Sequence, residues 1–402
     1  MQCSKKATKA GRIVTGSKFL SFDKITSLLG RLVSFDTVSR NSNMQLIDFL
    51  RAYLADLGVA SHLVPNEDGS KANLYATIGP NIPGGVVLSG HTDVVPIDNQ
   101  DWTVPPFELT KKQDRYYGRG TCDMKGFVAI ACAAVPAMLE KSLSKPIHLA
   151  FSYDEEIGCV GAPDMIKEIV STLPPIDAVI VGEPTNMQVA NMHKGILGAR
   201  THICGLEAHS SQTHRGVSAN TYAARLITFI DDINREFMAN PHDDLKLEPP
   251  HSTINVGLIN GGIAANIIAR DCDFTFDFRS VPHDNVDETL ERIQTYAETL
   301  EAEMKQSFEG ASINLDIRRV PGLNSTDNDR AAQLCMRLAG KNDTIGVPYG
   351  TEAGQFQQAG YSTVVCGPGS IDQAHKPDEY IEIEQLKLGA QFVDRLIDDL
   401  AD

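Results

Sequence analysis

The chain has 402 residues, of which 42% are apolar and 22% are charged, and its formal net charge is −16 at pH 7. This length favours two domains over one, and the residue balance is that of a soluble globular protein. The negative charge argues against nucleic acid or an anionic membrane surface as partner, and no apolar stretch approaches the ~20 residues that span a bilayer.

The N-terminal stretch is basic and has no acidic residue before Asp23; its cations are Lys5, Lys6, Lys9, Arg12 and Lys18. Because it also lacks the apolar segment of a secretion signal, we expect residues 1–22 to form a disordered leader, with an organellar transit segment as the alternative. The eight cysteines are scattered and include no CxxC pair. This usage favours a reducing compartment and predicts a cytoplasmic protein.

Helices and short apolar strands are predicted in the first part of the chain. Apolar residues at helical spacing predict one helix that starts near Asp23 and a second at about 44–57, which Gly58 ends. A further helix is predicted over 127–139, and the expected strands are 73–78, 86–89, 147–151, 178–181 and, much later, 363–366. Because these strands are almost wholly apolar, we expect an α/β sheet that is covered on both faces.

The middle of the chain has a different pattern. Apolar residues alternate in 196–204 and 272–278, as in a sheet with one exposed face, and an amphipathic helix follows each run. Further strands at 253–259 and 313–317 complete the order βαββαβ, which is a small α+β unit. The expected division is an inserted domain at 193–320 and an α/β domain at 23–192 and 321–402.

Acidic and histidine side chains follow the predicted buried strands. In chain order they are His91 and Asp93; Asp123, before a helix; Asp154, Glu155 and Glu156; Glu183; and Asp372, His375, Asp378 and Glu379. Ligands of open α/β sheets bind outside the carboxyl ends of the strands, so five segments deliver these side chains to one rim. A single acid there is usually a turn or capping residue, but the joint pattern is typical of a metal site. Imidazole and carboxylate ligands suit Zn²⁺, Co²⁺ or Mn²⁺, and the number of carboxylates favours two metals.

Local spacing suggests further roles. His91 and Asp93 point to the same side of an extended chain, so Asp93 can accept the second imidazole N–H and fix the tautomer. The adjacent Glu155 and Glu156 diverge, which lets one bind metal while the other acts as a general base on water. Asp154 is interpreted as a solvated or capping residue.

Seven segments carry a family resemblance: SGHTDVVP, GRGTCDMKG, YDEEIG, GEPT, EAHSSQTHRGVSA, FDFR and GPGSIDQAHKPDEY. In this order they resemble the acetylornithine deacetylase / succinyl-diaminopimelate desuccinylase family of metal-dependent amidohydrolases, over residues 23–402. The resemblance implies a zinc-dependent aminopeptidase-like catalytic domain whose inserted domain serves as lid and dimerisation domain. It also implies two zinc ions per subunit, for which cobalt can substitute, and a homodimer formed through the inserted domain.

The resemblance implies a role for each site residue. The metal ligands are Asp123 as the bridge, His91 and Glu183 at one zinc, and Glu156 and His375 at the other. Glu155 is the general base, and Asp93 orients the imidazole of His91. His209 in EAHSS reaches the active site from the inserted domain, often that of the partner subunit, where an imidazole N–H can stabilise an oxyanion. The alternative for His209 is a loop histidine bonded to a neighbouring serine.

Substrate contacts are implied on both domains. Arg279 in FDFR and Asn266 in AANIIA resemble contacts to a substrate carboxylate, although Arg279 can also form a surface ion pair. The turn with Gly369 and Ser370 can offer backbone N–H groups to the same anion. Glu352 in GTEAG is predicted to meet the cationic end of an ornithine side chain.

The segments GTEAGQFQQAG and CGPGSIDQAHKPDEYI resemble the deacetylases of this family more than the desuccinylase. The expected reaction therefore removes the acetyl group from N2-acetyl-L-ornithine, giving L-ornithine and acetate, as a step of arginine biosynthesis. The alternatives are succinyl-diaminopimelate desuccinylase, a broader N-acyl-amino-acid deacylase, and a catalytically silent metal-binding homologue. The intact set of acids and histidines argues against the silent homologue, and the absence of a GxSxG motif argues against a serine hydrolase.

Overall fold

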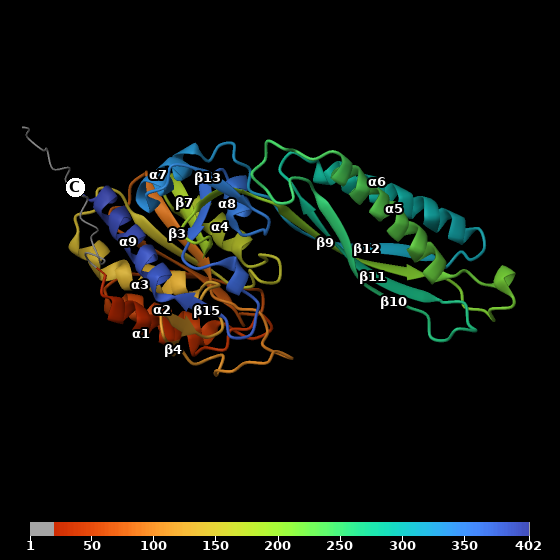
Figure 1. The fold of residues 1–402 in the computed structure, drawn as a ribbon, viewed down its shortest axis with the longest axis horizontal. Helices are drawn as coiled ribbons and strands as arrows, with labels where there is room; N and C mark the ends of the chain where they lie inside the picture. Colours follow the sequence, from red (N-terminus) through yellow and green to blue (C-terminus); the bar gives the residue numbers. More distant parts are fainter. Residues whose placement is uncertain (1–19, 402) are drawn as a thin grey trace, which may run out of the picture.

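The computed structural model describes residues 20–401 as two lobes joined by a narrow connection (Figure 1). The larger lobe contains an eight-stranded sheet and the smaller a four-stranded sheet. The predicted leader lies outside the described residues up to position 19, whereas Leu20 is buried and the first helix begins at Phe22. None of the helices within residues 20–401 is long and apolar enough to cross a membrane.

The large sheet contains all the strands that the apolar runs predict. Its strands are β1 (Ser61–Pro65), β2 (Ala72–Ile78), β3 (Gly85–His91), β6 (Ile147–Ser152), β7 (Ile176–Pro184), β8 (Val189–His193), β13 (Thr344–Val347) and β14 (Thr363–Gly367). Their order is β1-β2-β6-β3-β7-β14-β8-β13, and β3 runs parallel to both β6 and β7. The edge strands β1 and β13 are partly exposed and have no continuous apolar run, which is why the sequence did not reveal them.

Helices cover both faces of this sheet. One face packs against α1 (Phe22–Val33), α2 (Met44–Asp56), α3 (Lys125–Glu140), α7 (Asp329–Ala339) and α9 (Ile383–Leu400), and the other against α4 (Ala162–Thr172) and α8 (Ala353–Gln358). In β3, Val86 and Leu88 belong to the first of these cores and Val87 to the second. Each such side chain contributes about 1.5–3 kcal/mol on burial, so the double cover explains the unbroken apolar runs.

A third, small sheet lies beside the large one in the order β15-β5-β4. It consists of β4 (Thr110–Lys112), β5 (Arg115–Tyr117) and β15 (Tyr380–Glu382), and a short 3-10 helix at Ile371–Gln373 precedes β15. These elements connect the turn before α3 with the segment after β14, because β5 pairs with β15.

The inserted domain has the predicted order βαββαβ. Its elements are β9 (Gly195–Cys204), a 3-10 helix (Thr213–Arg215), α5 (Ala219–Ala239), β10 (Thr253–Gly261), β11 (Asp271–Ser280), α6 (Val286–Lys305) and β12 (Ser312–Val320). The sheet is antiparallel in the order β10-β11-β9-β12, and α5 and α6 cover one of its faces. The alternation is confirmed, because Phe274, Phe276 and Phe278 are buried against these helices while the residues between them are partly exposed.

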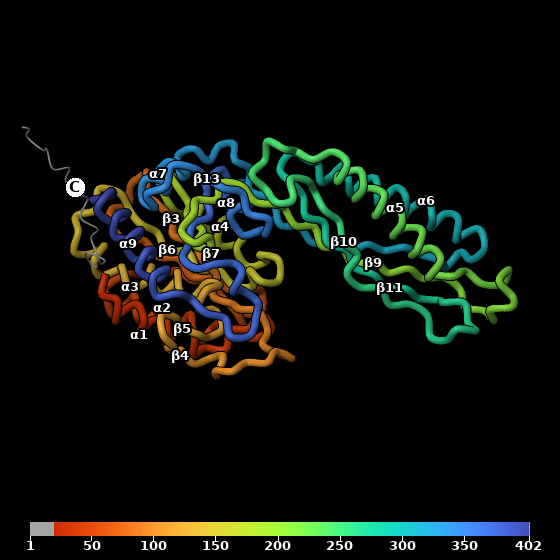
Figure 2. The backbone as a smooth tube through the Cα atoms, viewed as in Figure 1, coloured from red at the N-terminus to blue at the C-terminus, as the bar shows by residue number. Residues whose placement is uncertain are grey.

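Two crossing segments join the lobes (Figure 2). His193 and Leu323 form a backbone bridge in which each N–H donates to the other carbonyl at 3.1 Å. A Cβ on Gly322 would lie 2.9 Å from the backbone nitrogen of Gly195, so the crossing leaves no room for a side chain there. The two chain connections of the inserted domain therefore meet at one tight crossing, and the loop before β10 adds a second contact, because the Gly346 N–H of β13 donates to the Lys246 carbonyl at 3.1 Å.

Candidate metal centre

The carboxyl ends of three strands bring the predicted segments to one edge of the large sheet. β3 ends at His91, β6 ends two residues before Asp154, and Glu183 is the penultimate residue of β7. These strands are parallel neighbours in the order β6-β3-β7, so their ends lie side by side. Asp123 comes from the turn before α3, and His375 comes from the segment after β14.

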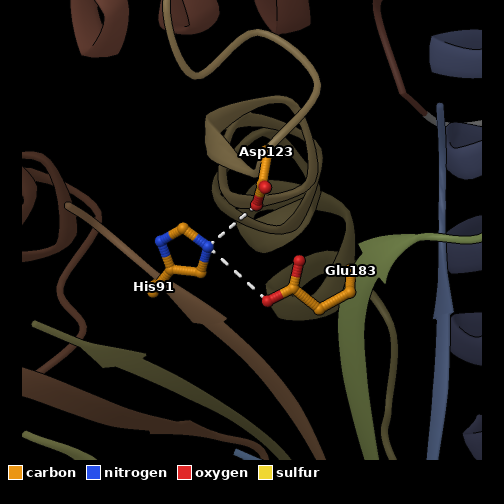
Figure 3. A group of neighbouring side chains, drawn as sticks. All are labelled: His91, Asp123 and Glu183. Atoms are coloured by element: carbon orange, nitrogen blue, oxygen red, sulfur yellow. Dashed lines mark hydrogen bonds and ion pairs between the residues drawn. The ribbon is translucent and has the colours of Figure 1, made fainter. Parts of the chain in front are cut away.

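His91, Asp123 and Glu183 form the first ligand group (Figure 3). His91 Nε2 lies 3.0 Å from Asp123 Oδ1 and 3.5 Å from Glu183 Oε1, and both carboxylates point at this nitrogen. All three side chains are buried, with exposed fractions of 1%, 7% and 6%. One imidazole nitrogen and two carboxylate oxygens around a common point form a ligand set that Zn²⁺ accepts.

Asp123, Glu156 and His375 form the second group. His375 Nε2 lies 2.9 Å from Glu156 Oε2 and 3.5 Å from Asp123 Oδ2. Asp123 thus directs one carboxylate oxygen to each group, and the ligand atoms of each group lie within 4.8 Å of one another. A shared carboxylate is how two-metal hydrolases bridge their ions. The grouping has the pairing that the family resemblance implies, and metal binding itself stays a prediction.

The electrostatics of the centre fit bound dications. Burial raises the pKa of Glu183 well above its usual range, that of Glu155 to about 8 and that of Glu156 to about 7. Burial acts on Asp123 in the same direction, but hydrogen bonds with His375 and His91 hold its pKa below the usual value. Carboxylates that resist ionisation become stable anions beside a cation, and imidazole with carboxylate is a donor set for zinc, cobalt or manganese.

Asp93 positions both the imidazole and the two glutamates. His91 Nδ1 is 2.9 Å from the Asp93 carbonyl oxygen and 3.6 Å from its carboxylate. The carboxylate accepts the N–H groups of Glu155 and Glu156 at 3.1 and 3.3 Å and the Ser39 hydroxyl at 2.7 Å. The predicted contact to His91 therefore runs mainly through the backbone of Asp93, because its side chain holds the following turn.

Glu155 lies outside both ligand groups. Its Oε1 accepts a hydrogen bond from the Cys159 thiol, with a sulfur–oxygen distance of 3.1 Å. Because burial raises the pKa of Glu155 to about 8, this carboxyl group can gain and lose a proton near neutral pH. The adjacent Glu156 faces His375, so the predicted divergence of the two side chains is present.

The interpretation of Asp154 as a solvated residue is wrong. Its side chain is only 10% exposed, and both carboxylate oxygens contact Lys71 Nζ, at 2.6 and 2.7 Å. The two residues are 83 positions apart. No local pattern could reveal this pair, because it exists only after β2 and β6 have come together.

His209 and Asn266 lie together on the inserted domain. His209 is exposed and its Nδ1 is 2.8 Å from Ser211 Oγ, as in the alternative left open by the sequence. The Asn266 carbonyl accepts the N–H of Ser210 at 3.0 Å, which places it next to His209. Within residues 20–401, no hydrogen bond or ion pair joins either residue to the metal centre.

Arg279 lies at the other end of the same sheet. Its Nε donates to Asp277 at 2.7 Å, and it pairs with Ile196 near the start of β9. His209 follows the opposite end of β9, at Cys204. Ile196 and Cys204 are eight positions apart, which corresponds to about 26 Å in a strand. Most of the length of β9 therefore lies between Arg279 and the loop that carries His209.

Glu352 does not face an open surface. It accepts hydrogen bonds from Ser89 and Ser152, each at 2.6 Å and each to a different carboxylate oxygen, and is 1% exposed. The structure contradicts the predicted contact with a substrate ammonium group, because no oxygen remains exposed. Glu352 instead ties β3 to β6 beneath the ligands.

The turn with Gly369 and Ser370 borders the metal centre. The Cys122 thiol donates to the Ser370 carbonyl at 3.3 Å, which places the turn beside Asp123. The Gly369 N–H donates to the Gln385 side chain at 3.1 Å. A substrate anion would have to replace Gln385 to use this N–H group.

Glu379 was among the acids that follow the predicted strands, but the sequence indicated no role for it. Its carboxylate accepts the N–H groups of Gly120, Cys122 and Asp123 at 2.9, 2.8 and 3.1 Å. Arg119 pairs with it at 2.8 Å, and both side chains are 1% exposed. Glu379 thus fixes the turn that carries the shared ligand, and its place in the PDEY segment was the only signal.

Two ligand groups that share a carboxylate at the strand ends, beside a glutamate that neither group uses, are typical of metal-dependent hydrolases. Residues 87–399 match the model of the family described as "Peptidase family M20/M25/M40". The chain belongs to this family, and it is a metal-dependent hydrolase that acts on amide bonds.

Relatives and solved structures agree with this assignment. The chain is 35% identical over 370 residues to acetylornithine deacetylase of Pasteurella multocida, covering 90% of this chain and 93% of that one. It is also 35% identical over 366 residues to acetylornithine deacetylase of Proteus mirabilis, covering 90% and 92%.

Among solved structures, the fold is similar to aminopeptidase PepT of Bacillus cereus, with a TM-score of 0.73, 20% identity and coverage of 95% and 100%. It is also similar to YXEP of Bacillus subtilis, described as a dinuclear metal binding peptidase, with a TM-score of 0.60, 14% identity and coverage of 94% and 98%. At these identities the two structures show the fold.

Proposed function

We propose that this protein is a dinuclear zinc hydrolase that converts N2-acetyl-L-ornithine to L-ornithine and acetate, as a step of arginine biosynthesis in the cytoplasm. The observation that carries the proposal is the position of Asp123 between two ligand groups, with Glu155 outside both. The substrate assignment is supported by the relatives named acetylornithine deacetylase, which match 90% of the chain.

The chain's own ligands would hold two zinc ions, for which cobalt can substitute. His91 and Glu183 belong to one site, Glu156 and His375 to the other, and Asp123 to both. When bound, such ions lower the pKa of water and polarise a carbonyl group.

Glu155 is the proposed general base. It takes the proton of the attacking water and delivers it to the leaving amine of ornithine. Burial favours the protonated form of Glu155, which suits a group that takes up a proton, and its place outside both ligand groups leaves it free to pass the proton on.

His209 is proposed to donate its imidazole N–H to the developing oxyanion, and Asn266, beside it, to contact the substrate. Arg279 is proposed to bind the substrate carboxylate with its fork of N–H donors, next to the turn with Gly369 and Ser370. About 26 Å of β9 separates Ile196, which pairs with Arg279, from Cys204, which precedes the His209 loop, so the two contacts are proposed to come from the inserted domains of two subunits.

The proposed homodimer forms through the inserted domain. β10 is an edge strand of its sheet, and three large apolar side chains at its end are highly exposed: Leu258 at 69%, Ile259 at 61% and Ile263 at 84%. An apolar strand edge is a ready surface for pairing with a second strand.

A panel of N-acyl amino acids assayed with zinc or cobalt tests the proposal. The expected result is a kcat/KM for N2-acetyl-L-ornithine at least about 100-fold above that for N-succinyl-diaminopimelate. The succinyl group carries an additional carboxylate, which would have no partner in a pocket that fits an acetyl group. Comparable rates would favour a broader N-acyl-amino-acid deacylase, and a preference for the succinyl substrate would favour the desuccinylase. No turnover by the zinc-loaded protein would favour the silent homologue.

A further inference from the structure

The turn that carries Glu155 and Glu156 has a special backbone shape. Asp154 has a φ of 54°, in the left-handed region that only a minority of non-glycine residues adopt. After it, the Glu155 carbonyl accepts the N–H groups of Gly158 and Cys159 at 2.9 and 2.8 Å. This shape sets the directions of the two glutamates, so whatever holds Asp154 also determines where they point.

Lys71 holds Asp154 from the start of β2. Besides its two contacts with the carboxylate, Lys71 Nζ donates to the Ser39 carbonyl. The Lys71 side chain is 13% exposed, so the ion pair is largely protected from solvent. A pair in this environment is sensitive to the loss of one partner, which leaves an unpaired charge in a poorly solvated place.

The contacts of Lys71 close a ring around the turn. Ser39, whose carbonyl Lys71 binds, donates its hydroxyl to Asp93 at 2.7 Å. Asp93 in turn accepts the N–H groups of Glu155 and Glu156. Lys71 therefore reaches the turn twice, directly at Asp154 and indirectly through Ser39 and Asp93.

Of the three consecutive acids, Asp154 has its own cation in Lys71. This fixed cation compensates Asp154, so bound metal has to compensate only Glu156 and the other ligands. Asp154 is thereby held away from the ligand groups, and neither of them includes it.

We propose that Lys71 is a positioning residue for the hydrolytic centre, which fixes the turn at Asp154 so that Glu156 faces the second metal group and Glu155 stays free as the base. The proposal rests on the proposed function for the role of Glu155. Its consequence for metal binding by Glu156 and His375 can be measured without any substrate.

The test compares Lys71→Met with Lys71→Arg and with Lys145→Met. Lys145 pairs with Asp177 at 2.8 Å near the opposite ends of β6 and β7, so Lys145→Met removes a lysine–aspartate pair far from the metal centre. Each full-length variant is measured for Zn²⁺ bound per chain at fixed free zinc, for melting temperature, and for kcat and KM on N2-acetyl-L-ornithine.

Lys71→Met is expected to weaken binding of the second zinc and to lower kcat by about 10–100-fold, as losses of residues that orient metal ligands do. KM should change by less than about threefold, because the substrate contacts remain. Lys71→Arg should recover most of both losses, since it keeps the charge. Lys145→Met should bind zinc and turn over substrate like the wild type.

The proposal is overturned if Lys71→Met keeps two zinc ions and the wild-type kcat, whatever its melting temperature. If Lys71→Met does not fold, Lys71→Met with Asp154→Asn removes both charges. That double variant should still lose the second zinc, and wild-type zinc binding by it would also overturn the proposal. A wild type that hydrolyses no N-acyl amino acid refutes the proposed function, whereas the zinc measurement still decides the role of Lys71.

Discussion

The α/β domain and the inserted domain use polar residues in opposite ways. Within residues 20–401, every buried acidic, basic or histidine side chain lies outside 195–320. The buried polar side chains from β9 to β12, residues 195–320, are all neutral hydroxyl residues, namely Thr201, Ser252, Ser280 and Thr289, whereas His193 and Lys194 are buried just before β9. Burying charge is unfavourable unless a partner compensates it, so the α/β domain needs partners for buried charges, whereas the ion pairs of the inserted domain lie nearer its surface.

This difference indicates how the work of the protein is divided. The groups expected to bind metal and move protons are held rigidly at strand ends by residues such as Asp93 and Glu379. The groups expected to contact the substrate from the inserted domain, such as His209, lie exposed on its surface. The metal ligands are therefore held by the α/β domain alone, without a contribution from the inserted domain of the same chain.

Metal removal should produce the largest difference between the two domains. Chelation is expected to abolish hydrolysis and to lower the free energy of unfolding of the α/β domain by about 3–4 kcal/mol, the linkage term for ligand at 100–1,000 times its Kd. Hydrogen exchange should rise first in residues 152–160 and stay unchanged in β11. Equal increases in both regions would contradict the division between the domains.

Mixing two inactive variants tests whether the inserted domain completes the site of a second chain. His209→Ala should lower kcat by about 10²–10³-fold, as loss of an oxyanion donor does. Mixed with Glu155→Gln, it should regain about a quarter of wild-type activity, because half of the dimers then hold one intact site. Activity that stays at the level of the separate variants would show that His209 does not act across subunits.

Two buried histidines should each make the stability of the α/β domain depend on pH. Burial lowers the pKa of His148 and of His193 to about 4, and no histidine within 195–320 is buried. In the unfolded chain these histidines bind protons below their ordinary pKa of about 6.5. Their contribution to the free energy of unfolding is therefore fully present above that pH and is lost as the pH falls toward 4, by roughly 3 kcal/mol per histidine.

Denaturant unfolding measured between pH 7 and pH 4 checks this expectation. His148→Gln should reduce the pH dependence by the share of one histidine. An identical pH dependence of wild type and His148→Gln would contradict the assignment of a neutral buried imidazole.

The sequence predicted the residues whose signal is local. Unbroken apolar runs predicted the central strands. The histidine and acidic residues that follow these runs, His91, Glu156 and Glu183, were predicted to lie at one edge of the sheet. Residues paired over long distances could not be predicted in this way. The partner of Asp154 is 83 residues away, and the partners of Glu352 lie 200 and 263 residues away. Their roles follow from the packing of β2, β3 and β6 and leave no pattern in their own segments.

The central claim is that the adjacent glutamates divide the work, with Glu156 binding metal and Glu155 moving protons. Glu155→Gln tests it most directly, through zinc content and kcat on N2-acetyl-L-ornithine, with the exposed Glu67→Gln as the matched control. The account predicts two zinc ions per chain and a kcat lowered by about 10²–10⁴-fold, the usual contribution of general acid–base catalysis. A variant that keeps wild-type kcat, or that loses zinc together with activity, would contradict it.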